Sequence, residues 1–369
     1  MTDMTDSISQ CCKNAETDNI TEEKRTDIKG LYLHELKKLL SSERYKGIPP
    51  YRAAEINKFV LKGAKSFDEM TSLPLKLREM LSEDFYIPSA ETVRVQRSSI
   101  DGTRKYLFSF DDKNMAESVY MQYHHGNTAC ISTQAGCRMG CAFCATGKNG
   151  YFRDLLASEM LLQIEEMQRE TGTVISNVVL MGMGEPLDNY ENTVRFIRLA
   201  NDKNGLNIGQ RHFSLSTCGL VDKIYKLAEE ELSVGLSVSL HAPDDVIRQK
   251  IMPVSKKYDM RSLLEACRFY ADKTKRRVTY EYTMIKGLND SERCAEVLAL
   301  KIRGTLCHVN LIPVNPVKGS EFEPSGRETV KRFAEKLSSL GINVTVRRKL
   351  GSDIDASCGQ LKAKTKSGA

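Results

Sequence analysis

The spacing of hydrophobic residues divides the chain into stretches with different expected structures. Residues 1–26 are rich in Thr, Asp, Asn and Glu and show no apolar periodicity, which predicts a disordered tail. From residue 27 to residue 88, apolar side chains such as Leu33, Leu36 and Leu40 recur at helical spacing. A Pro-Pro pair interrupts this pattern, and we therefore expect a small N-terminal domain of short helices.

The pattern changes to alternation between residues 89 and 127. Two alternating runs flank Asp101-Gly102, a dipeptide typical of tight hairpin turns. A third alternating run covers residues 117–121. We expect a small β segment here, linking the helical domain to the rest of the chain.

Strands and helices alternate from residue 128 to residue 361. Helical runs separate most of the candidate strands, which predicts an α/β fold with a parallel sheet covered by helices. About six or seven such units make a (β/α) barrel or part of one, in which functional groups lie at the carboxyl ends of the strands. Residues 362–369 are expected to form a C-terminal tail. The candidate strands are Cys130–Thr133, Val178–Met183, Phe213–Cys218, Gly235–His241, Val278–Met284, Val309–Val314 and Val344–Arg348.

Composition narrows the class of protein. The 369 residues are 41% hydrophobic, which suits a globular core, and no apolar run approaches the ~20 residues of a membrane span. The polar start of the chain lacks the apolar region of a secretory signal, so we expect a cytoplasmic protein with no membrane association. In a reducing compartment the 11 cysteines are expected to bind metal, act in catalysis or lie buried. The net charge of +6 permits a nucleic-acid partner without requiring one.

Three cysteines, Cys137, Cys141 and Cys144, stand within eight residues, on a Gly-containing loop just after a predicted strand. Thiolates are the preferred ligands of iron–sulfur clusters, and three of them leave one iron of a [4Fe–4S] cluster free. That iron can chelate the amino and carboxylate groups of S-adenosylmethionine, whose reductive cleavage yields a 5′-deoxyadenosyl radical. A zinc site is the competing interpretation. Zinc sites usually close with a fourth ligand, often from a second cysteine pair, and the sequence offers no such pair.

Polar motifs follow the later predicted strands in order. Gly184-Glu185 follows the strand after the cysteine loop, where glycine lets the backbone approach a ligand and a carboxylate can accept hydrogen bonds from a methionyl ammonium. Ser216, the Ser239–His241 motif and Asn315 lie near later strand ends. Hydroxyl, imidazole and amide groups suit a ribose, a carboxylate and an adenine edge, although each alone could be an ordinary polar group at a strand end.

At this point the sequence resembles a known family, the radical-SAM RNA methyltransferases of the RlmN/Cfr type, and most of all its RlmN branch. The resemblance runs from about Ile28 to Leu361. It implies a partial barrel of radical-SAM type. It also implies methylation at adenosine C2 in 23S rRNA, at the peptidyl-transferase centre, and in tRNA next to the anticodon. The motifs that carry the resemblance lie at residues 117–120, 130–137, 181–187 and 353–361.

The resemblance also implies cofactors and residue roles. Cys137, Cys141 and Cys144 would hold a [4Fe–4S] cluster. Cys358 matches the family's methylated cysteine, Cys130 its partner in a transient disulfide, and Glu117 its proton acceptor. The residues implied to contact S-adenosylmethionine are Gly184, Glu185, Ser216, Ser239, Leu240, His241 and Asn315.

The chemistry explains why two further cysteines are needed. Adenine C2 is electron-poor and is not a nucleophile, so ordinary methyl transfer has no lone pair to receive the group. A thiolate at Cys358 can take up a methyl group by displacement, and radical chemistry can then pass the carbon to C2. Cys130 can release the product by attacking the sulfur of Cys358, because thiol–disulfide exchange forms a disulfide that cellular reductants reset.

The partners expected are 23S rRNA and tRNA, with a one-electron donor such as flavodoxin or ferredoxin, and the protein itself is expected to be a monomer. The target base must leave its stack, and basic side chains would hold the phosphates with strong salt dependence. The candidate phosphate contacts are Lys37, Lys38, Arg52, Lys58, Lys62 and Arg347–Lys349.

Two alternatives stay open at this stage. The first is methylation at adenosine C8 of 23S rRNA, as in the Cfr branch, although Pro186 after Gly184-Glu185 is more like the C2 branch. The second is an RNA-binding iron–sulfur protein without catalysis. Cys130 and Cys358 discriminate this second alternative, because only the enzyme requires them.

Overall fold

The structure is a computed structural model that describes residues 25–124, 126–315, 317 and 319–363. The chain divides into two compact units, with the boundary between Pro88 and Ser89. Most of both predicted tails, including Cys11 and Cys12, lies outside the described residues. Among the helices that are described, none is long and apolar enough to cross a membrane.

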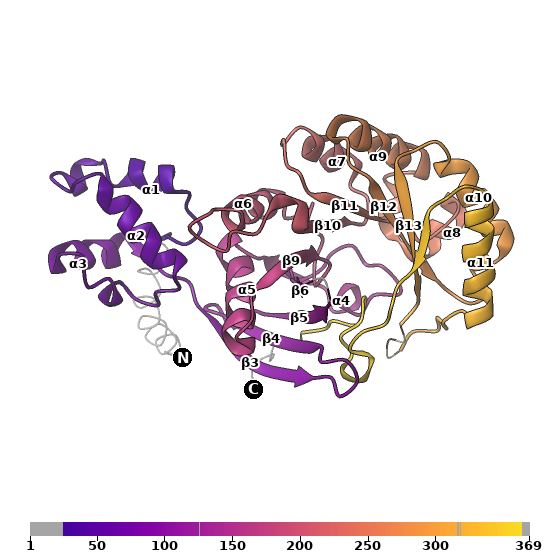
Figure 1. Cartoon of the computed structure of the whole chain (residues 1–369), viewed down its shortest axis with the longest axis horizontal. Helices are drawn as coiled ribbons and strands as arrows, with labels where there is room; N and C mark the ends of the chain where they lie inside the picture. The colour runs from indigo at the N-terminus through magenta and orange to yellow at the C-terminus, as the bar shows by residue number, and fades with distance from the viewer. Residues whose placement is uncertain (1–24, 125, 316, 318, 364–369) are drawn as a thin grey trace, which may run out of the picture. The chain divides into compact units, whose positions relative to one another are not determined.

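The first unit consists of short helices and a two-stranded sheet (Figure 1). Its elements are β1 (Thr26–Asp27), α1 (Leu33–Leu39), α2 (Tyr51–Leu61), α3 (Leu75–Asp84) and β2 (Phe85–Tyr86). The two strands pair in parallel, so Thr26, which was expected in the tail, belongs to the folded unit. Helices α2 and α3 each follow a proline, Pro50 and Pro74, at a position where a missing N–H costs no helical hydrogen bond.

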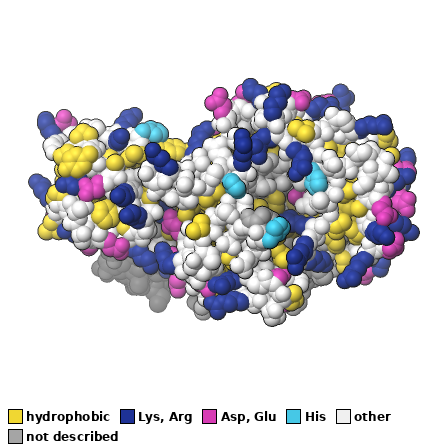
Figure 2. All heavy atoms as spheres, in the orientation of Figure 1, with side chains coloured by type: hydrophobic (Ala, Val, Ile, Leu, Met, Phe, Trp, Pro, Cys, Tyr) yellow, Lys and Arg dark blue, Asp and Glu magenta, His cyan; other side chains and the backbone are white. Residues whose placement is uncertain are grey.

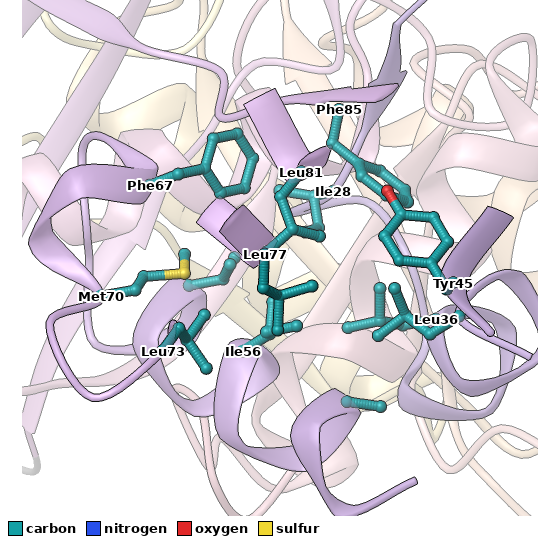
Figure 3. Close-up of a cluster of buried hydrophobic side chains, with 13 residues drawn as sticks. Ile28, Leu36, Tyr45, Ile56, Phe67, Met70, Leu73, Leu77, Leu81 and Phe85 are labelled. Atoms are coloured by element: carbon teal, nitrogen blue, oxygen red, sulfur yellow. The ribbon is translucent and has the colours of Figure 1, made fainter. Parts of the chain in front are cut away.

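The first unit has an apolar core of its own, which Figure 3 shows in close-up. Leu36, Ile56, Leu77, Leu81 and Phe85 come from its three helices and from β2, and each is at most 3% exposed. Burial of a side chain of this size contributes about 1.5–3 kcal/mol. The helical spacing read from the sequence therefore marks the core-facing side chains of this unit.

Ten strands form one mixed sheet in the second unit, in the order β14-β13-β12-β11-β10-β9-β6-β5-β4-β3 (Figure 1). Strands β6 and β9 to β14 pair in parallel, whereas β3 to β6 pair as antiparallel neighbours. Because β14 and β3 stand at the two ends, the sheet does not close, and the predicted partial α/β barrel is confirmed. The bounds are β3 Ala90–Arg97, β4 Arg104–Phe110, β5 Met115–Tyr123, β6 Gly126–Cys130, β9 Ile175–Leu180, β10 Phe213–Thr217, β11 Gly235–Ser239, β12 Val278–Met284, β13 Cys307–Pro313 and β14 Val344–Val346.

Helices connect the parallel strands and cover the sheet (Figure 1). Several begin at a polar cap: Asp244 accepts a hydrogen bond from the N–H of Ile247, and Asp259 accepts one from that of Ser262. The helices are α4 (Ala145–Lys148), α5 (Ala157–Thr171), α6 (Tyr190–Ala200), α7 (Val221–Ala228), α8 (Asp245–Ile251), α9 (Met260–Thr274), α10 (Glu292–Ile302) and α11 (Arg327–Ser339). A separate antiparallel pair, β7 (Gln134–Gly136) and β8 (Tyr151–Asp154), brackets the cysteine loop.

Two differences from the sequence prediction in this unit bear on the position of the site. The β segment over residues 89–127 continues the main sheet, because β5 pairs with β6 and β6 with β9. The predicted strand Cys130–Thr133 ends at Cys130. The reason is local: the Ser132 hydroxyl donates to the Glu117 carbonyl at 2.5 Å and accepts from the Met183 N–H at 2.8 Å, which replaces strand pairing with side-chain hydrogen bonds.

Candidate functional site

The cysteine loop lies between β7 and α4. Its start is fixed by Gly136, which has a φ of +83° and whose Cβ, if present, would stand 2.2 Å from the Gly150 carbonyl oxygen. The Cys137 N–H donates to that same carbonyl at 2.7 Å. Farther along the loop, the Ala142 N–H donates to the Ile251 carbonyl at 2.9 Å, which ties the loop to the end of α8.

The loop and the strand ends line one cavity, which we call the cluster pocket. Its polar and sulfur-bearing lining includes Cys137, Cys141, Cys144, Gly184, Glu185, Ser216, Thr217, Ser239, His241, Asn315, Arg347 and Cys358. Most of these groups follow β9, β10, β11 and β13, at the carboxyl ends where the parallel arrangement was expected to collect them. The predicted cluster ligands and most predicted co-substrate contacts therefore meet at one site.

The environment of the cysteines suits a cluster. Burial raises the pKa of Cys137 to about 12 and raises that of Cys141 still more, so these thiols remain neutral unless a bound cation stabilises the thiolate. Within the described part of the chain, no three His, Cys, Asp or Glu side chains gather closely enough to hold a single metal ion. A cluster does not require such a gathering, because each cysteine binds a different iron atom.

Glu185 is held rigidly at the floor of the cluster pocket. Its side chain is buried, and its two carboxylate oxygens accept hydrogen bonds from the N–H of Leu187 at 3.0 Å and of Cys218 at 2.7 Å. Burial raises the pKa of Glu185 in spite of these bonds. A cationic group in the pocket, such as an ammonium, would offset that burial cost.

His241 presents a defined donor to the cluster pocket. Burial, followed by the positive charge of Arg248, lowers the pKa of His241 to about 3, so the imidazole is neutral at physiological pH. Its Nδ1 accepts a hydrogen bond from the Thr283 N–H at 3.0 Å, which places the single ring proton on Nε2. The Phe143 ring from the cysteine loop packs edge-on against the imidazole, with ring centroids 4.9 Å apart.

Leu240 differs from the other predicted contacts. Its side chain is fully buried and does not line the cluster pocket. Its backbone N–H donates to the Glu281 carbonyl, and its own carbonyl accepts from Arg248 Nε at 3.2 Å. Leu240 therefore supports the strand end between Ser239 and His241 in this structure.

A second cavity, the thiol pocket, contains the other two cysteines of interest. Cys130 at the end of β6 and Cys358 near the C-terminus both line it, together with Arg347. Cys358 and Arg347 line the cluster pocket as well. The three-cysteine loop and the two-cysteine pair therefore face adjoining cavities that share Cys358.

Arg347 provides the positive charge beside the cysteine pair. Burial, with the charge of Cys358 as a second cause, raises the pKa of Cys130 to about 12, and Arg347 acts against that shift. The charge of Cys358 is in turn the largest cause that raises the pKa of Arg347. Arg347 also lies 3.8 Å from the buried Glu281 carboxylate. It was expected to hold RNA phosphates, whereas in the structure its guanidinium is directed toward the thiols and the cluster pocket.

The C-terminal segment, residues 350–363, brings Cys358 to this place. It runs back to the antiparallel strands, where the Asp353 carboxylate accepts from Ser98 Oγ at 2.7 Å and from the Ser99 N–H at 2.9 Å. Around the cysteine, Asn315 Nδ2 donates to the Cys358 carbonyl at 3.1 Å, and the Ala145 N–H donates to that of Gly359 at 2.7 Å. Hydrogen bonds from distant elements thus position the segment on both sides of Cys358.

Glu117, the predicted proton acceptor, lies on the other side of this segment. Its buried carboxylate accepts from the Lys362 N–H at 2.8 Å and faces Lys105 at 3.7 Å and Arg94 at 3.9 Å. It lines a different cavity, together with Asp355, and lines neither the thiol pocket nor the cluster pocket. The contact with Lys362 also shows that this residue, expected in the tail, packs on the sheet.

Basic side chains do not gather into one patch on the face of the molecule that Figure 2 shows. Figure 2 shows Lys and Arg side chains spread over the visible face of each unit, interspersed with acidic ones. The predicted phosphate contacts in the first unit lie on α1 and α2 and beside the end of α2. Those after β14, from Arg347 to Lys349, line the thiol pocket.

Comparison with known proteins identifies the superfamily of the chain. The family model described as the radical SAM superfamily matches residues 131–298. The chain is 43% identical to a radical SAM methyltransferase from Sphaerobacter thermophilus of known crystal structure, with a TM-score of 0.86 over 92% of this chain and 100% of that one.

Curated relatives are similar along nearly their whole length. The chain is 51% identical to the probable dual-specificity RNA methyltransferase RlmN of Clostridium botulinum, over 85% of this chain and 90% of that protein. Identity to the proteins of the same description is 49% in Lachnospira eligens and 47% in Clostridioides difficile, over 92% and 94% of this chain. These similarities confirm the expected cofactors, a [4Fe–4S] cluster and S-adenosylmethionine. The chain belongs to the RlmN family of dual-specificity RNA methyltransferases, within the radical SAM superfamily.

Proposed function

We propose that this enzyme methylates C2 of adenosine in 23S rRNA and in tRNA, with Cys358 as the carrier of the methyl group. The observation that supports this most strongly is the position of Cys358. Cys358 lines both the cluster pocket and the thiol pocket, which also contains Cys130. A sulfur that must react first with a co-substrate and then with a partner thiol needs access to both sites.

Each element of the site then has a task. When bound, the cluster and S-adenosylmethionine supply the methyl group and a 5′-deoxyadenosyl radical. The Cys358 thiolate accepts the methyl group by displacement, and Arg347 stabilises that thiolate. His241 Nε2–H and Asn315 offer hydrogen bonds that orient the co-substrate in the cluster pocket. Glu185 supplies a negative charge that attracts the ammonium group of the co-substrate.

Cys130 acts in the final step, the release of the product from Cys358. Its thiol is buried, and burial, followed by any negative charge on the Cys358 sulfur, raises the pKa of Cys130. A Cys358 sulfur that is bonded to the transferred carbon has no negative charge, so this second cause is absent when Cys130 reacts. Attack of Cys130 Sγ on Cys358 Sγ then forms a disulfide and breaks the bond between Cys358 Sγ and the transferred carbon. That carbon keeps the electron pair and takes up a proton to become the methyl group of the released base, and a reductant restores the two thiols.

The proton acceptor stays a prediction from the family resemblance. Glu117 can reach a base in the thiol pocket only if the C-terminal segment moves, because Lys362 and Asp355 lie beside its carboxylate. Glu117→Gln keeps an oxygen for the Lys362 N–H and loses the ability to take up a proton. The proton-acceptor role predicts that this variant traps RNA on Cys358 without release. Normal turnover by Glu117→Gln would show that Glu117 only holds the C-terminal segment in place.

The experiment that tests the function is anaerobic reconstitution of the cluster, followed by reaction with rRNA and tRNA and mass spectrometry of the nucleosides. We expect 2-methyladenosine from the wild type and none from Cys358→Ala, with the iron content unchanged. Product methylated at C8 would assign the protein to the Cfr-like activity. No methylated nucleoside from the wild type, with RNA binding equal in the wild type and in Cys358→Ala, would support a non-catalytic RNA-binding role.

We also propose a low-potential one-electron donor such as flavodoxin or ferredoxin, a cytoplasmic location and a monomeric state. The donor is required because the cluster must be reduced, and the cytoplasm supplies both the RNA substrates and the reductant for the cysteine pair. Size-exclusion chromatography with light scattering tests the monomer.

A further inference from the structure

Arg248 is a fully buried arginine in α8, with 0% of its surface exposed. Its guanidinium binds main-chain carbonyls at the ends of two strands: Nη2 donates to Cys218 at 2.6 Å and to Ser239 at 3.2 Å, and Nε donates to Leu240 at 3.2 Å. Its Nη1 has no hydrogen-bond partner in the described part of the chain. No carboxylate among the same residues forms an ion pair with it.

The guanidinium is one residue removed from the cluster pocket, because Cys218 and Ser239, whose carbonyls it binds, both line that pocket. Its helix also contacts the cysteine loop. Ile251, at the end of this helix, accepts the hydrogen bond from the loop N–H of Ala142, and it packs in one apolar cluster with Cys141. Arg248 itself does not line the cluster pocket, so it is not a co-substrate contact.

Such a charge is costly in the protein by itself. Burial of an ion without a paired partner costs several kcal/mol, and a guanidinium stays protonated under all physiological conditions. Three thiolates on an oxidised [4Fe–4S] core leave one net negative charge, and one-electron reduction makes it two. A fixed positive charge on the protein side of this site favours the more negative state.

We propose that Arg248 is the buried counter-charge of the cluster, which acts through the Cys141 side of the loop to favour the reduced state. This assignment rests on the site described for the proposed function, and it makes Arg248 a positioning residue with an electrostatic task. The three carbonyl contacts hold the guanidinium in place, and its Nη1 makes no hydrogen bond within the described residues. The charge of Asp245 acts on Arg248, but no ion pair joins the two side chains in that part of the chain.

The test is an anaerobic redox titration of the reconstituted full chain, monitored by electron paramagnetic resonance, in Arg248→Gln and Arg248→Lys. The neutral variant is expected to be about tenfold harder to reduce, which corresponds to about 59 mV more negative for one electron. The lysine variant, which keeps the charge, is expected to stay near the wild type. Arg268→Gln removes an exposed arginine from α9 and is the matched control.

Each result decides the proposal. An unchanged potential in Arg248→Gln with full iron content would overturn it, and so would equal shifts in the Gln and Lys variants. If Arg248→Gln fails to hold iron, retention by Arg248→Lys supports the charge, whereas equal loss in both shows a purely structural role. The titration uses no RNA, so a wrong assignment of the RNA product leaves this readout intact.

Discussion

The cysteine loop and the cysteine pair use the same side chain in opposite ways. Cys137, Cys141 and Cys144 lie within eight residues, on a short loop that begins at Gly136, whose positive φ only glycine adopts readily. Cys130 and Cys358 stand far apart in the sequence, and only the returning C-terminal segment brings them to one pocket. The loop can be recognised as a local motif, whereas the pair exists only in the folded chain. In the proposed mechanism the loop serves a reaction shared by a large superfamily, and the pair specifies what that reaction does here.

The largest expected effect comes from breaking the loop. Cys141→Ala removes a cluster ligand in a buried position, so we expect loss of bound iron and no detectable methylation of Cys358 or of RNA. Iron analysis and absorption spectra after anaerobic reconstitution measure this. The matched control is Cys294→Ala in α10, which leaves the site untouched. A full complement of iron in Cys141→Ala would show that Cys141 is not a cluster ligand.

The next effect separates the pair from the loop. Cys130→Ala keeps the cluster and lets Cys358 accept the methyl group, but it removes the thiol that resolves the link between Cys358 and RNA. We therefore expect a covalent protein–RNA adduct, visible as a nuclease-sensitive shift on a denaturing gel, and little free product. Normal turnover without an adduct would remove Cys130 from the mechanism.

A smaller effect tests the charge that accompanies the pair. Arg347 lines the thiol pocket with Cys358, and a positive charge beside a sulfur nucleophile favours displacement, so Arg347→Gln is expected to slow methylation of Cys358 by about tenfold. Peptide mass spectrometry of the methylated cysteine measures the rate, and Arg347→Lys should restore part of it. If the Gln variant methylates Cys358 at full rate but binds RNA weakly, the phosphate-binding role first predicted for Arg347 is the correct one.

The smallest effect is a pH signature on the cluster side. The folded pKa of His241, about 3, lies below the ordinary value near 6.5, so its contribution to stability is full above about pH 6.5 and declines as pH falls toward 3. The wild type should lose about 1.4 kcal/mol of unfolding free energy per pH unit in this window from this group alone. His241→Gln should show a correspondingly shallower slope in urea unfolding at about pH 7, 6 and 5. His34→Gln, at an exposed position of α1, should keep the wild-type slope.

Residues differ in how far the sequence could place them. Gly184, Glu185, Ser216, Ser239, His241 and Asn315 follow parallel strands, and the fold collects such positions at one edge, so their arrangement in one pocket was predictable. Leu240 was not, because alternation at a strand end places its side chain in the core. Glu117 was not, because its cavity depends on where the C-terminal segment crosses the sheet.

Arg347 and Arg248 show most clearly what could not be predicted from the sequence. Arg347 stands in a basic run, which in sequence indicates a solvated or RNA-facing surface. Arg248 lies in a short helix with nothing nearby in sequence to show that it is buried. Neither position contains a local signal, because what each guanidinium does depends on elements from other parts of the chain.

The sequence by itself determined the α/β class, the helical first unit, the cysteine loop and the order of polar groups after the strands. Periodicity, turns and closely spaced ligands are local properties, and a single chain displays them without folding. Only the tertiary structure decided that Cys358 faces two pockets, that Arg347 lies beside the thiols and that the buried Arg248 binds the strand ends that line the cluster pocket. Those facts depend on long-range hydrogen bonds and burial, and the free energy of a charge is set by what surrounds it rather than by its neighbours in sequence.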